Sequence, residues 1–228
     1  MCGGGAATRN CRLEKLLFHV KHSPSPLSPE QFAEQTGALP PILTRLQAYV
    51  DVLLKWQRKI NLIGRGTVDD VWRRHLLDSA QLLPLLPSQP VVLDMGSGAG
   101  FPGLVLAIMT DCTVHLVESD GRKCAFLRQA ARLTGTENVH VHDARMEALP
   151  PFPVDVIGAR ALTGLGKLLD LAEPFLGPQT VCLFLKGQKA QDELTEALKT
   201  RTMEVEMINS QTDPSGTILK LSNIHRNA

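Results

Sequence analysis

Short apolar runs alternate with longer amphipathic stretches from residue 91 to the end of the chain. The short runs predict strands at 91–95, 113–118, 138–142, 154–159 and 180–186. Between them, apolar residues spaced three or four apart predict helices near 102–110, 121–134, 164–175 and 189–200. This alternation predicts an α/β fold with a mostly parallel sheet and helices on both faces. Two last runs, 203–209 and 217–221, flank a polar turn and predict a hairpin that adds one antiparallel strand.

The first 88 residues show helical patterns and no strand pattern. Ser28 and Gln31 form the signal of a capping box at a helix start. A longer helix follows, with apolar residues three or four positions apart from Ile42 to Ile60, and another covers about 69–83. Residues 1–27, with their glycines and Ser-Pro pairs, predict a flexible leader or a basic arm for a polyanion. The predicted parts are therefore the leader, a helical N-terminal cap (28–88) and a sheet domain (89–228).

A glycine-rich turn follows the first predicted strand and opens a helix. It begins at Asp94 and contains Gly96, Gly98 and Gly100, followed by Phe101. Glycine lets the backbone turn tightly and come close to a ligand that a side chain would block. In an open α/β sheet, ligands bind beyond the carboxyl ends of the strands. The turn therefore predicts a cofactor pocket.

Charge distinguishes between two cofactors for this pocket. Gly98, Gly100 and Gly103 formally match the dinucleotide fingerprint, but that match is weak by itself. The negative charge of Asp94 would oppose a pyrophosphate, whereas S-adenosylmethionine carries cationic groups and no phosphate. Glu118, at the end of the second strand, would accept hydrogen bonds from the ribose hydroxyls of either cofactor. The pattern favours S-adenosylmethionine over NAD(P) and is typical of class I methyltransferases.

Residues after the later strands fit the same pocket. Met146 and Glu147 follow the third strand and could bracket an adenine, although Met146 could also be ordinary core. Arg160 follows the fourth strand at the expected substrate entrance, with a solvated surface arginine as the alternative. Lys186 ends the fifth strand, where a simple strand-to-helix turn would also explain it.

Composition narrows the function classes. With 43% hydrophobic residues the chain can bury a sizeable core, which excludes disorder for most of it. No apolar run approaches the roughly 20 residues that a membrane helix needs. Five cysteines without a C-x-x-C pair argue against disulfides and a zinc site, and favour the reducing cytoplasm. The net charge of +1 conceals a basic stretch between residues 55 and 74, which indicates either an RNA surface or a solvated helix face.

Missing motifs narrow the reaction. The chain lacks the N/D-P-P-Y/F motif of exocyclic amino transfer after the fourth strand, and the cysteine nucleophile of pyrimidine C5 transfer. These absences suit N7 of a purine, which has a lone pair and no proton, so that its attack on a methyl group needs no general base. Orientation would then supply most of the rate. We therefore assign no catalytic acid or base and no metal ligand.

Over residues 39–222 the sequence resembles the RsmG (GidB) family of bacterial 16S ribosomal RNA guanine-N7 methyltransferases. The matching motifs are Lys55-Trp56 with Asn61-Leu62, residues 74–79 (RHLLDS), residues 100–103 (GFPG), Phe126-Leu127-Arg128, Ala159-Arg160-Ala161 and Leu185-Lys186-Gly187. Several of these motifs have no general methyltransferase meaning, so their joint occurrence is specific.

The resemblance implies a Rossmann-like class I methyltransferase domain with an N-terminal helical cap. It places donor binding on Gly96, Phe101, Met146, Glu147 and Arg160, with Glu118 at the ribose. The implied substrate is N7 of a guanine in the decoding-region loop of 16S rRNA, as RNA or in the small ribosomal subunit, with no stable protein partner. The candidates for RNA contact are Arg74, Arg128, Arg160 and Lys186. An NAD(P)-dependent oxidoreductase and a non-catalytic RNA-binding or ribosome assembly factor remain the alternatives.

Overall fold

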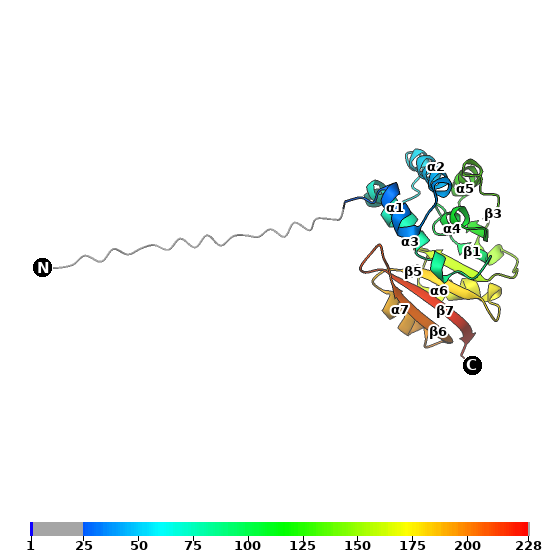
Figure 1. Ribbon diagram of the computed structural model, residues 1–228. Helices are drawn as coiled ribbons and strands as arrows, with labels where there is room; N and C mark the ends of the chain where they lie inside the picture. The colour runs from blue at the N-terminus through cyan, green and yellow to red at the C-terminus, as the bar shows by residue number, and fades with distance from the viewer. Residues whose placement is uncertain (2–24, 228) are drawn as a thin grey trace.

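A single seven-stranded sheet organises the computed structural model, which describes Met1 and residues 25–227. The strand order is β3-β2-β1-β4-β5-β7-β6, and β7 runs antiparallel to both of its neighbours (Figure 1). The predicted mostly parallel sheet with one antiparallel strand is therefore confirmed. The strands are β1 (Val91–Met95), β2 (Thr113–Glu118), β3 (Val139–Asp143), β4 (Val156–Arg160), β5 (Val181–Lys186), β6 (Arg201–Asn209) and β7 (Thr217–Arg226).

Strand register brings the functional segments together at one edge of the sheet. Met95 of β1 pairs with Ala159 of β4, so the glycine turn and Arg160 leave neighbouring strands at the same level. Glu118 of β2 likewise pairs with Asp143 of β3. Because the carboxyl ends of parallel strands face the same way, the segments that follow them surround one site.

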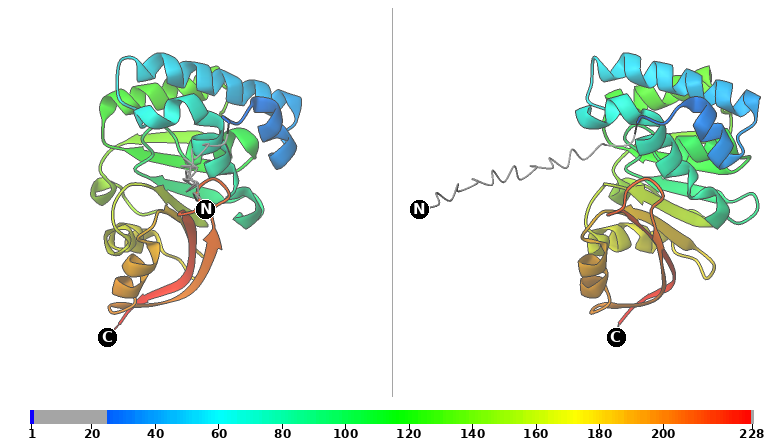
Figure 2. Two further views of the ribbon diagram at one scale, coloured as in Figure 1. Left: turned by 90° about the vertical axis from the view of Figure 1, so that its left-hand side faces the viewer. Right: turned by 60° about the vertical axis from the view of Figure 1, so that its left-hand side comes forward.

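Helices cover both faces of the sheet, as the sequence predicts. On one face α4 (Gly103–Met109) and α5 (Gly121–Leu133) pack against the strands, and α2 (Pro40–Gln57) lies alongside α5 (Figures 1 and 2). The other face carries α6 (Leu165–Ala172) and α7 (Ala190–Ala197). The helix predicted to reach residue 175 leaves α-helical geometry at Ala172 and ends as a 3₁₀ turn containing Pro174, which cannot supply the backbone N–H that an α-helix needs.

The N-terminal region departs from prediction in one helix. The capping box at Ser28 and Gln31 is present at the start of α1 (Pro29–Thr36). The single helix expected over 69–83 is instead a 3₁₀ turn (Arg65–Asp70), a π-helical turn (Trp72–Leu77), a short α3 (Asp78–Ala80) and a 3₁₀ turn (Leu83–Leu85). Four of the six π-turn residues are buried, which requires cover on more than one side. Single π turns of this kind are frequent at functional sites.

The helices before residue 88 share one hydrophobic core with the sheet. Tyr49 and Leu53 of α2 belong to the same buried cluster as Leu104 of α4 and Phe126 of α5. Each fully buried side chain of this size stabilises the fold by about 1.5–3 kcal/mol. The boundary between cap and sheet domain at residues 88 and 89 stays a prediction, but α2 is packed as an integral layer of the molecule.

The predicted leader lies outside the described residues except for Met1 and residues 25–27. Ser25 and Leu27 are hydrogen-bonded to the region that follows. Leu27 is buried and donates its backbone N–H to Asp70 Oδ1 at 2.8 Å, and Arg73 donates to the Ser25 carbonyl at 2.6 Å. In the described part of the chain, no helix combines the length and apolar character needed to cross a membrane.

Candidate cofactor and substrate site

A cavity of about 960 Å³ opens at the carboxyl ends of the parallel strands. Its walls come from the glycine turn, the ends of β2, β4 and β5, the segment after β3 and the π turn. That volume lies at the upper end of the range of small-molecule and cofactor sites. The cavity lies where the sequence predicts a cofactor pocket.

The glycine turn has a backbone that favours glycine. Gly96, Gly98 and Gly100 have φ angles of 67°, 58° and 92°, in the left-handed region that other residues rarely adopt. Two backbone hydrogen bonds hold the turn: the Ser97 N–H donates to the Val117 carbonyl at 3.0 Å, and the Gly100 N–H to the Ser97 carbonyl at 2.6 Å. The turn is thus a fixed surface of bare backbone between β1 and α4.

Glu118 is the carboxylate that joins this turn to the end of β2. Its Oε2 accepts from the Gly98 N–H at 3.0 Å, and its Oε1 accepts from the N–H groups of Ser119 and Asp120 at 2.8 Å each. A carboxylate has about four acceptor positions, so one remains for a ligand. Glu118 lines the cavity, where the sequence interpretation expects it.

Asp94 lies beneath the turn and is not on the cavity wall. It is fully buried, its Oδ2 accepts from the Gly103 N–H at 3.2 Å, and its Oδ1 has no hydrogen-bond partner. Burial raises the pKa of Asp94 to about 6. A Cβ atom at Gly103 would lie 2.7 Å from Asp94 Oδ2, so a glycine at this position makes room for the carboxylate. The negative charge of Asp94 would attract a cationic ligand through the glycine turn, without direct contact.

Phe101 is buried among side chains from three other segments of the chain. Its ring stacks on the His75 ring with centroids 4.9 Å apart, and the ring of Tyr49 lies 5.4 Å away. The Arg160 guanidinium lies over the same ring, 4.8 Å from its centroid. The buried hydroxyl of the same Tyr49 donates a hydrogen bond to the Ala99 carbonyl in the turn. The spacing of Tyr49 in the sequence is that of any buried helix residue and predicts only a place in the core.

Arg160 points inward to a polar cluster formed with His75, Asp78 and Arg74. Its Nη1 donates to Asp78 Oδ2 at 3.3 Å and to the Arg74 carbonyl at 3.1 Å, and its Nη2 lies 2.8 Å from His75 Nδ1. Burial, followed by the positive charges of Arg160 and Arg74, lowers the pKa of His75 to about 3. His75 is therefore neutral at physiological pH. Sequence reasoning included it only within the motif at 74–79.

Met146 and Glu147 lie together in the short 3₁₀ turn after β3, and both line the cavity. Met146 is buried and also belongs to the core cluster beneath α6, so the two interpretations of it are compatible. Glu147 is exposed and forms an ion pair with Lys167 at 3.5 Å.

The four candidates for RNA contact all form ion pairs within the protein. Arg74 pairs with Asp213 at 3.3 Å, and Arg128 with Asp143 at 3.9 Å. Arg160 pairs with Asp78, and Lys186 pairs with Glu193 at 2.6 Å with its side chain only 10% exposed. All but Arg128 line the cavity.

Three further cations line the cavity and form no salt bridge with any described residue: Lys123, Arg145 and Lys189. No sequence pattern distinguishes these three from other surface cations, because only the fold brings them to the cavity. No group of three or more His, Cys, Asp or Glu side chains within the described ranges is arranged to hold a metal ion.

The sheet order, the glycine turn after β1 and the acidic end of β2 together define a class I methyltransferase fold. Solved structures share it. M. jannaschii TYW2 in complex with AdoMet matches at 17% identity and a TM-score of 0.54, over 75% of this chain and 80% of that chain. A SAM dependent methyltransferase from Aquifex aeolicus matches at 19% identity and a TM-score of 0.54, over 68% and 95%.

The chain belongs to the GidB family, rRNA small subunit methyltransferase G, whose family model matches residues 42–217. Ribosomal RNA small subunit methyltransferase G of Rhodospirillum rubrum is 56% identical over 201 residues, covering 88% of this chain and all of that protein. The Rhodospirillum centenum protein of the same name is 56% identical over 80% of this chain and 84% of its own length. The resemblance inferred from the sequence motifs is therefore confirmed.

Proposed function

We propose that the protein transfers a methyl group from S-adenosylmethionine to N7 of a guanine in the decoding-region loop of 16S rRNA. The observation that carries this proposal is a cavity in which a rigid glycine turn is clamped to an acidic strand end, in a chain of the small-subunit rRNA methyltransferase family. Because ribosomal RNA is the substrate, we expect the reaction to take place in the cytoplasm.

The cavity residues fit the methyl donor. An added Cβ atom at Gly96 would lie 3.0 Å from Leu162 Cδ2. Leu162 therefore leaves no room for a side chain at this position of the turn. The remaining acceptor position of Glu118 suits a ribose hydroxyl. Buried Asp94, whose Oδ1 lacks a partner, places negative charge beneath the site of a cationic ligand. The residues proposed to form the donor site are two that lie behind the cavity wall, Asp94 and Gly100, and seven that line it: Gly96, Gly98, Phe101, Glu118, Met146, Glu147 and Arg160.

The same geometry disfavours a dinucleotide. A pyrophosphate needs free backbone N–H groups at the glycine turn. The Gly98 N–H already donates to Glu118, and the Gly103 N–H at the start of α4 donates to Asp94. Two carboxylates next to the turn would also repel phosphate. These contacts support S-adenosylmethionine over NAD(P).

Methyl transfer to N7 requires that the guanine and the donor are correctly oriented. It requires no proton acceptor, because N7 carries no proton. When bound, S-adenosylmethionine supplies the methyl carbon, and the carbon–nitrogen bond forms as the carbon–sulfur bond breaks. His75 is neutral but both of its ring nitrogens are in hydrogen bonds, so it is not free to act as a base. Arg160 would hold an anionic group of the substrate or donor inside the cavity. Its positive charge would also disfavour the cationic methylated guanine and aid product release.

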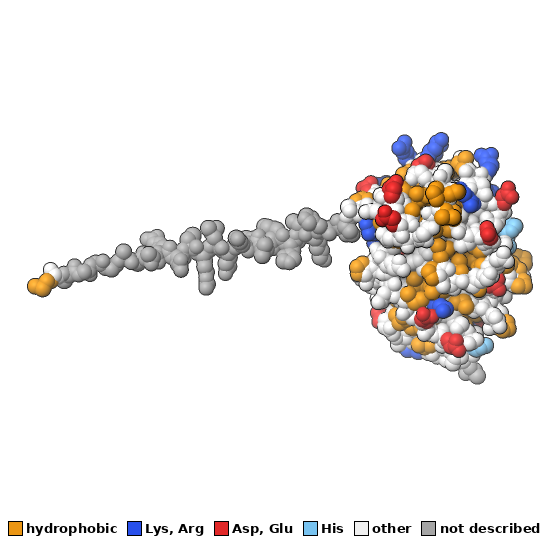
Figure 3. Space-filling model, viewed as in Figure 1, with side chains coloured by type: hydrophobic (Ala, Val, Ile, Leu, Met, Phe, Trp, Pro, Cys, Tyr) orange, Lys and Arg blue, Asp and Glu red, His pale blue; other side chains and the backbone are white. Residues whose placement is uncertain are grey.

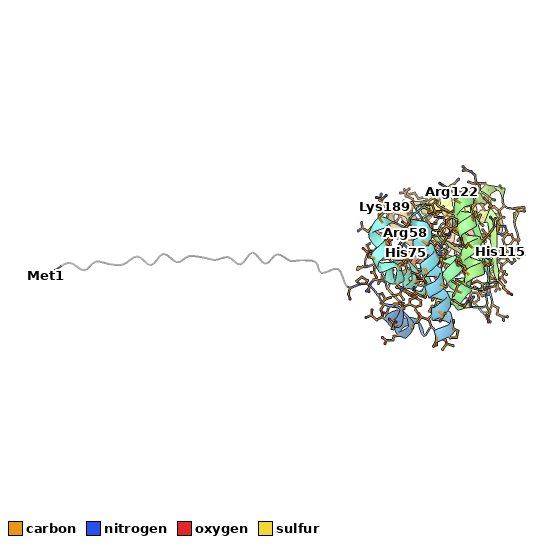
Figure 4. The ribbon with its side chains drawn as sticks, turned by 90° about the horizontal axis from the view of Figure 1, so that it is seen from above. Met1, Arg58, His75, His115, Arg122 and Lys189 are labelled. Carbon is orange, nitrogen blue, oxygen red and sulfur yellow. The ribbon has the colours of Figure 1, made fainter. Side chains whose placement is uncertain are left out.

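RNA contact is proposed to extend over the cations around the cavity. Lys123, Arg145 and Lys189 can bind phosphates directly, and the half-exposed Arg74 and Arg128 can exchange a carboxylate for a phosphate. Arg160 and Lys186 are less exposed and would act deeper in the site. Lys and Arg side chains project from the top of the molecule in Figure 3, and Figure 4 labels Lys189 among the residues of the cavity wall together with His75.

The test is methyl transfer with labelled donor to three substrates: naked 16S rRNA, 30S subunits and an assembly intermediate. We expect label in at least one of them, at a single guanine that becomes sensitive to the chemical cleavage specific for N7-methylguanine. Label at another atom would overturn the proposed position of methylation. RNA binding without label in any substrate would favour an assembly factor. Calorimetry that shows NAD binding and no S-adenosylmethionine binding would favour the oxidoreductase.

A further inference from the structure

The hydrogen bonds around His75 fix which ring nitrogen carries the proton. The Thr67 hydroxyl donates its only proton to the Gly64 carbonyl at 2.8 Å. Thr67 Oγ1, 2.7 Å from His75 Nε2, must therefore accept, so Nε2 carries the hydrogen. His75 Nδ1 is left as an acceptor, 2.8 Å from Arg160 Nη2. The imidazole is an oriented acceptor aimed at the arginine.

The Arg160 guanidinium has donors left over. Its five N–H groups include two on Nη1, which are used by Asp78 Oδ2 and the Arg74 carbonyl, and one on Nη2 that is used by His75. The Nε–H and the second Nη2–H have no partner among the described residues. Phe101 lies against the guanidinium and His75 stacks on the same ring, which leaves the arginine little freedom to rotate.

We propose that His75 is a positioning residue for methyl transfer: it holds the guanidinium of Arg160 so that its remaining N–H groups face an anionic group of the substrate or donor. This inference rests on the proposed function, since it assumes that Arg160 contacts one of those ligands. His75 also lines the cavity, but Thr67 and Arg160 occupy both of its ring nitrogens, so we infer that it acts through the arginine. Burial keeps His75 uncharged, so no second positive charge competes with Arg160.

The π turn positions His75 Nδ1 next to the Arg160 guanidinium. His75 lies in the turn Trp72–Leu77, three residues before Asp78, and both side chains contact the same guanidinium. Asp78 is in turn held by the Thr212 hydroxyl, which donates to its Oδ1 at 2.6 Å. Two residues of the N-terminal region, His75 and Asp78, thereby hold the side chain of Arg160 in β4.

Two substitutions separate the hydrogen bond from packing. His75→Phe keeps an aromatic ring on Phe101 and removes the acceptor, whereas His75→Asn keeps an acceptor near Nδ1 and removes the ring. We expect His75→Phe to lower kcat/KM for RNA methylation by about tenfold to a hundredfold, as for a lost hydrogen bond to a charged group. We expect His75→Asn to recover most of that loss. Thr44→Val, which removes an exposed hydroxyl bonded to Pro40 on α2, is the control and should leave kcat/KM unchanged.

A double-mutant cycle with Arg160→Gln decides whether the effect passes through the arginine. If it does, His75→Phe costs less than about threefold once Arg160 is replaced, because contacting residues couple. A His75→Phe enzyme with wild-type kcat/KM would overturn the proposal, and so would an equal loss in both backgrounds with no coupling in the affinities measured below. Thermal unfolding of every variant identifies losses that come from poor folding, in which case His75→Leu, which also lacks an acceptor, replaces His75→Phe.

The same cycle can be run on affinity, without chemistry. S-adenosylmethionine is titrated by calorimetry, and an unmodified 16S rRNA fragment by fluorescence anisotropy. Coupling between positions 75 and 160 in either affinity supports the positioning role even if the methylated atom is not N7. Absence of coupling in kcat/KM and in both affinities rejects the role while leaving the proposed function intact.

Discussion

The Tyr49 hydroxyl donates a hydrogen bond to the backbone carbonyl of Ala99, and both residues are buried. Tyr49 belongs to α2 and Ala99 to the glycine turn, 50 residues apart in the sequence. A Cβ atom at the next residue, Gly100, would lie 3.1 Å from the same hydroxyl oxygen. A helix of the N-terminal region therefore supports the proposed donor site directly.

Replacing Tyr49 by Phe should weaken both the fold and donor binding. The change leaves the buried Ala99 carbonyl without its partner, which costs about 1–3 kcal/mol. We expect the free energy of unfolding in urea to fall by that amount, and S-adenosylmethionine to bind several-fold more weakly in calorimetry. Gln47→Ala, at a partly exposed position of the same helix, is the control and should change neither. Unchanged stability and donor affinity in Tyr49→Phe would show that the turn holds itself.

Replacing Asp94 by Asn should stabilise the ligand-free protein above pH 6. The pKa of Asp94 rises from its ordinary 3.8 to about 6 on folding, so the folded state binds the proton more tightly. Asp94 therefore contributes favourably to the free energy of unfolding below pH 3.8, and this contribution is lost as the pH rises through about 6. Since one pKa unit corresponds to about 1.4 kcal/mol, the loss is on the order of 3 kcal/mol.

The measurement is urea unfolding at pH 4 and pH 7.5 for both proteins. We expect the free energy of unfolding of Asp94→Asn, relative to the wild type, to be higher at pH 7.5 than at pH 4. The variant should also bind S-adenosylmethionine more weakly, because the negative charge beneath the turn is gone. A constant difference in stability between the two proteins would contradict the assigned shift.

The histidines of β2 and β3 should make the protein sensitive to acid. Burial, followed by neighbouring His140 and His142, lowers the pKa of His115 to about 4, and burial also lowers the pKa of His142. The unfolded chain takes up these protons near pH 6.5 and the folded chain does not, so their stability contribution is present above pH 6.5 and lost as pH falls towards 4. His115→Asn should flatten this part of the pH–stability curve. His225→Asn, at an exposed position of β7, should retain the wild-type slope.

RNA affinity should fall with added salt, and the cavity cations should set part of the slope. Each neutralised phosphate contributes roughly 0.7–0.9 to the slope of log K against log salt. Replacing Lys123, Arg145 and Lys189 together by Gln should therefore reduce the slope by about 2 to 3. Lys199→Gln removes an exposed lysine away from the cavity and should leave the slope unchanged. An affinity independent of salt would reject phosphate contact for the whole surface.

Much of the fold could be predicted because burial periodicity is a local property. The predicted strand Val91–Met95 is β1 with the same ends, and the helix predicted over 121–134 is α5 (Gly121–Leu133). The region 65–85 could not be predicted in this way. Its buried residues face the core, the cavity and α1 at once, so their spacing matches no single helical period.

The sequence by itself determined where the backbone turns and which chemistry the turn favours, because glycines, a strand end and an acidic residue are neighbours along the chain. Only the tertiary structure decided which residues interact. It joins Tyr49 to Ala99 and His75 to Arg160 by hydrogen bonds, and it gives each of the four predicted RNA contacts an ion pair within the protein. A hydrogen bond forms over about 3 Å, and those between Tyr49 and Ala99 and between His75 and Arg160 join residues 50 and 85 positions apart. Such proximity depends on how the helices and the sheet pack, which no local pattern specifies.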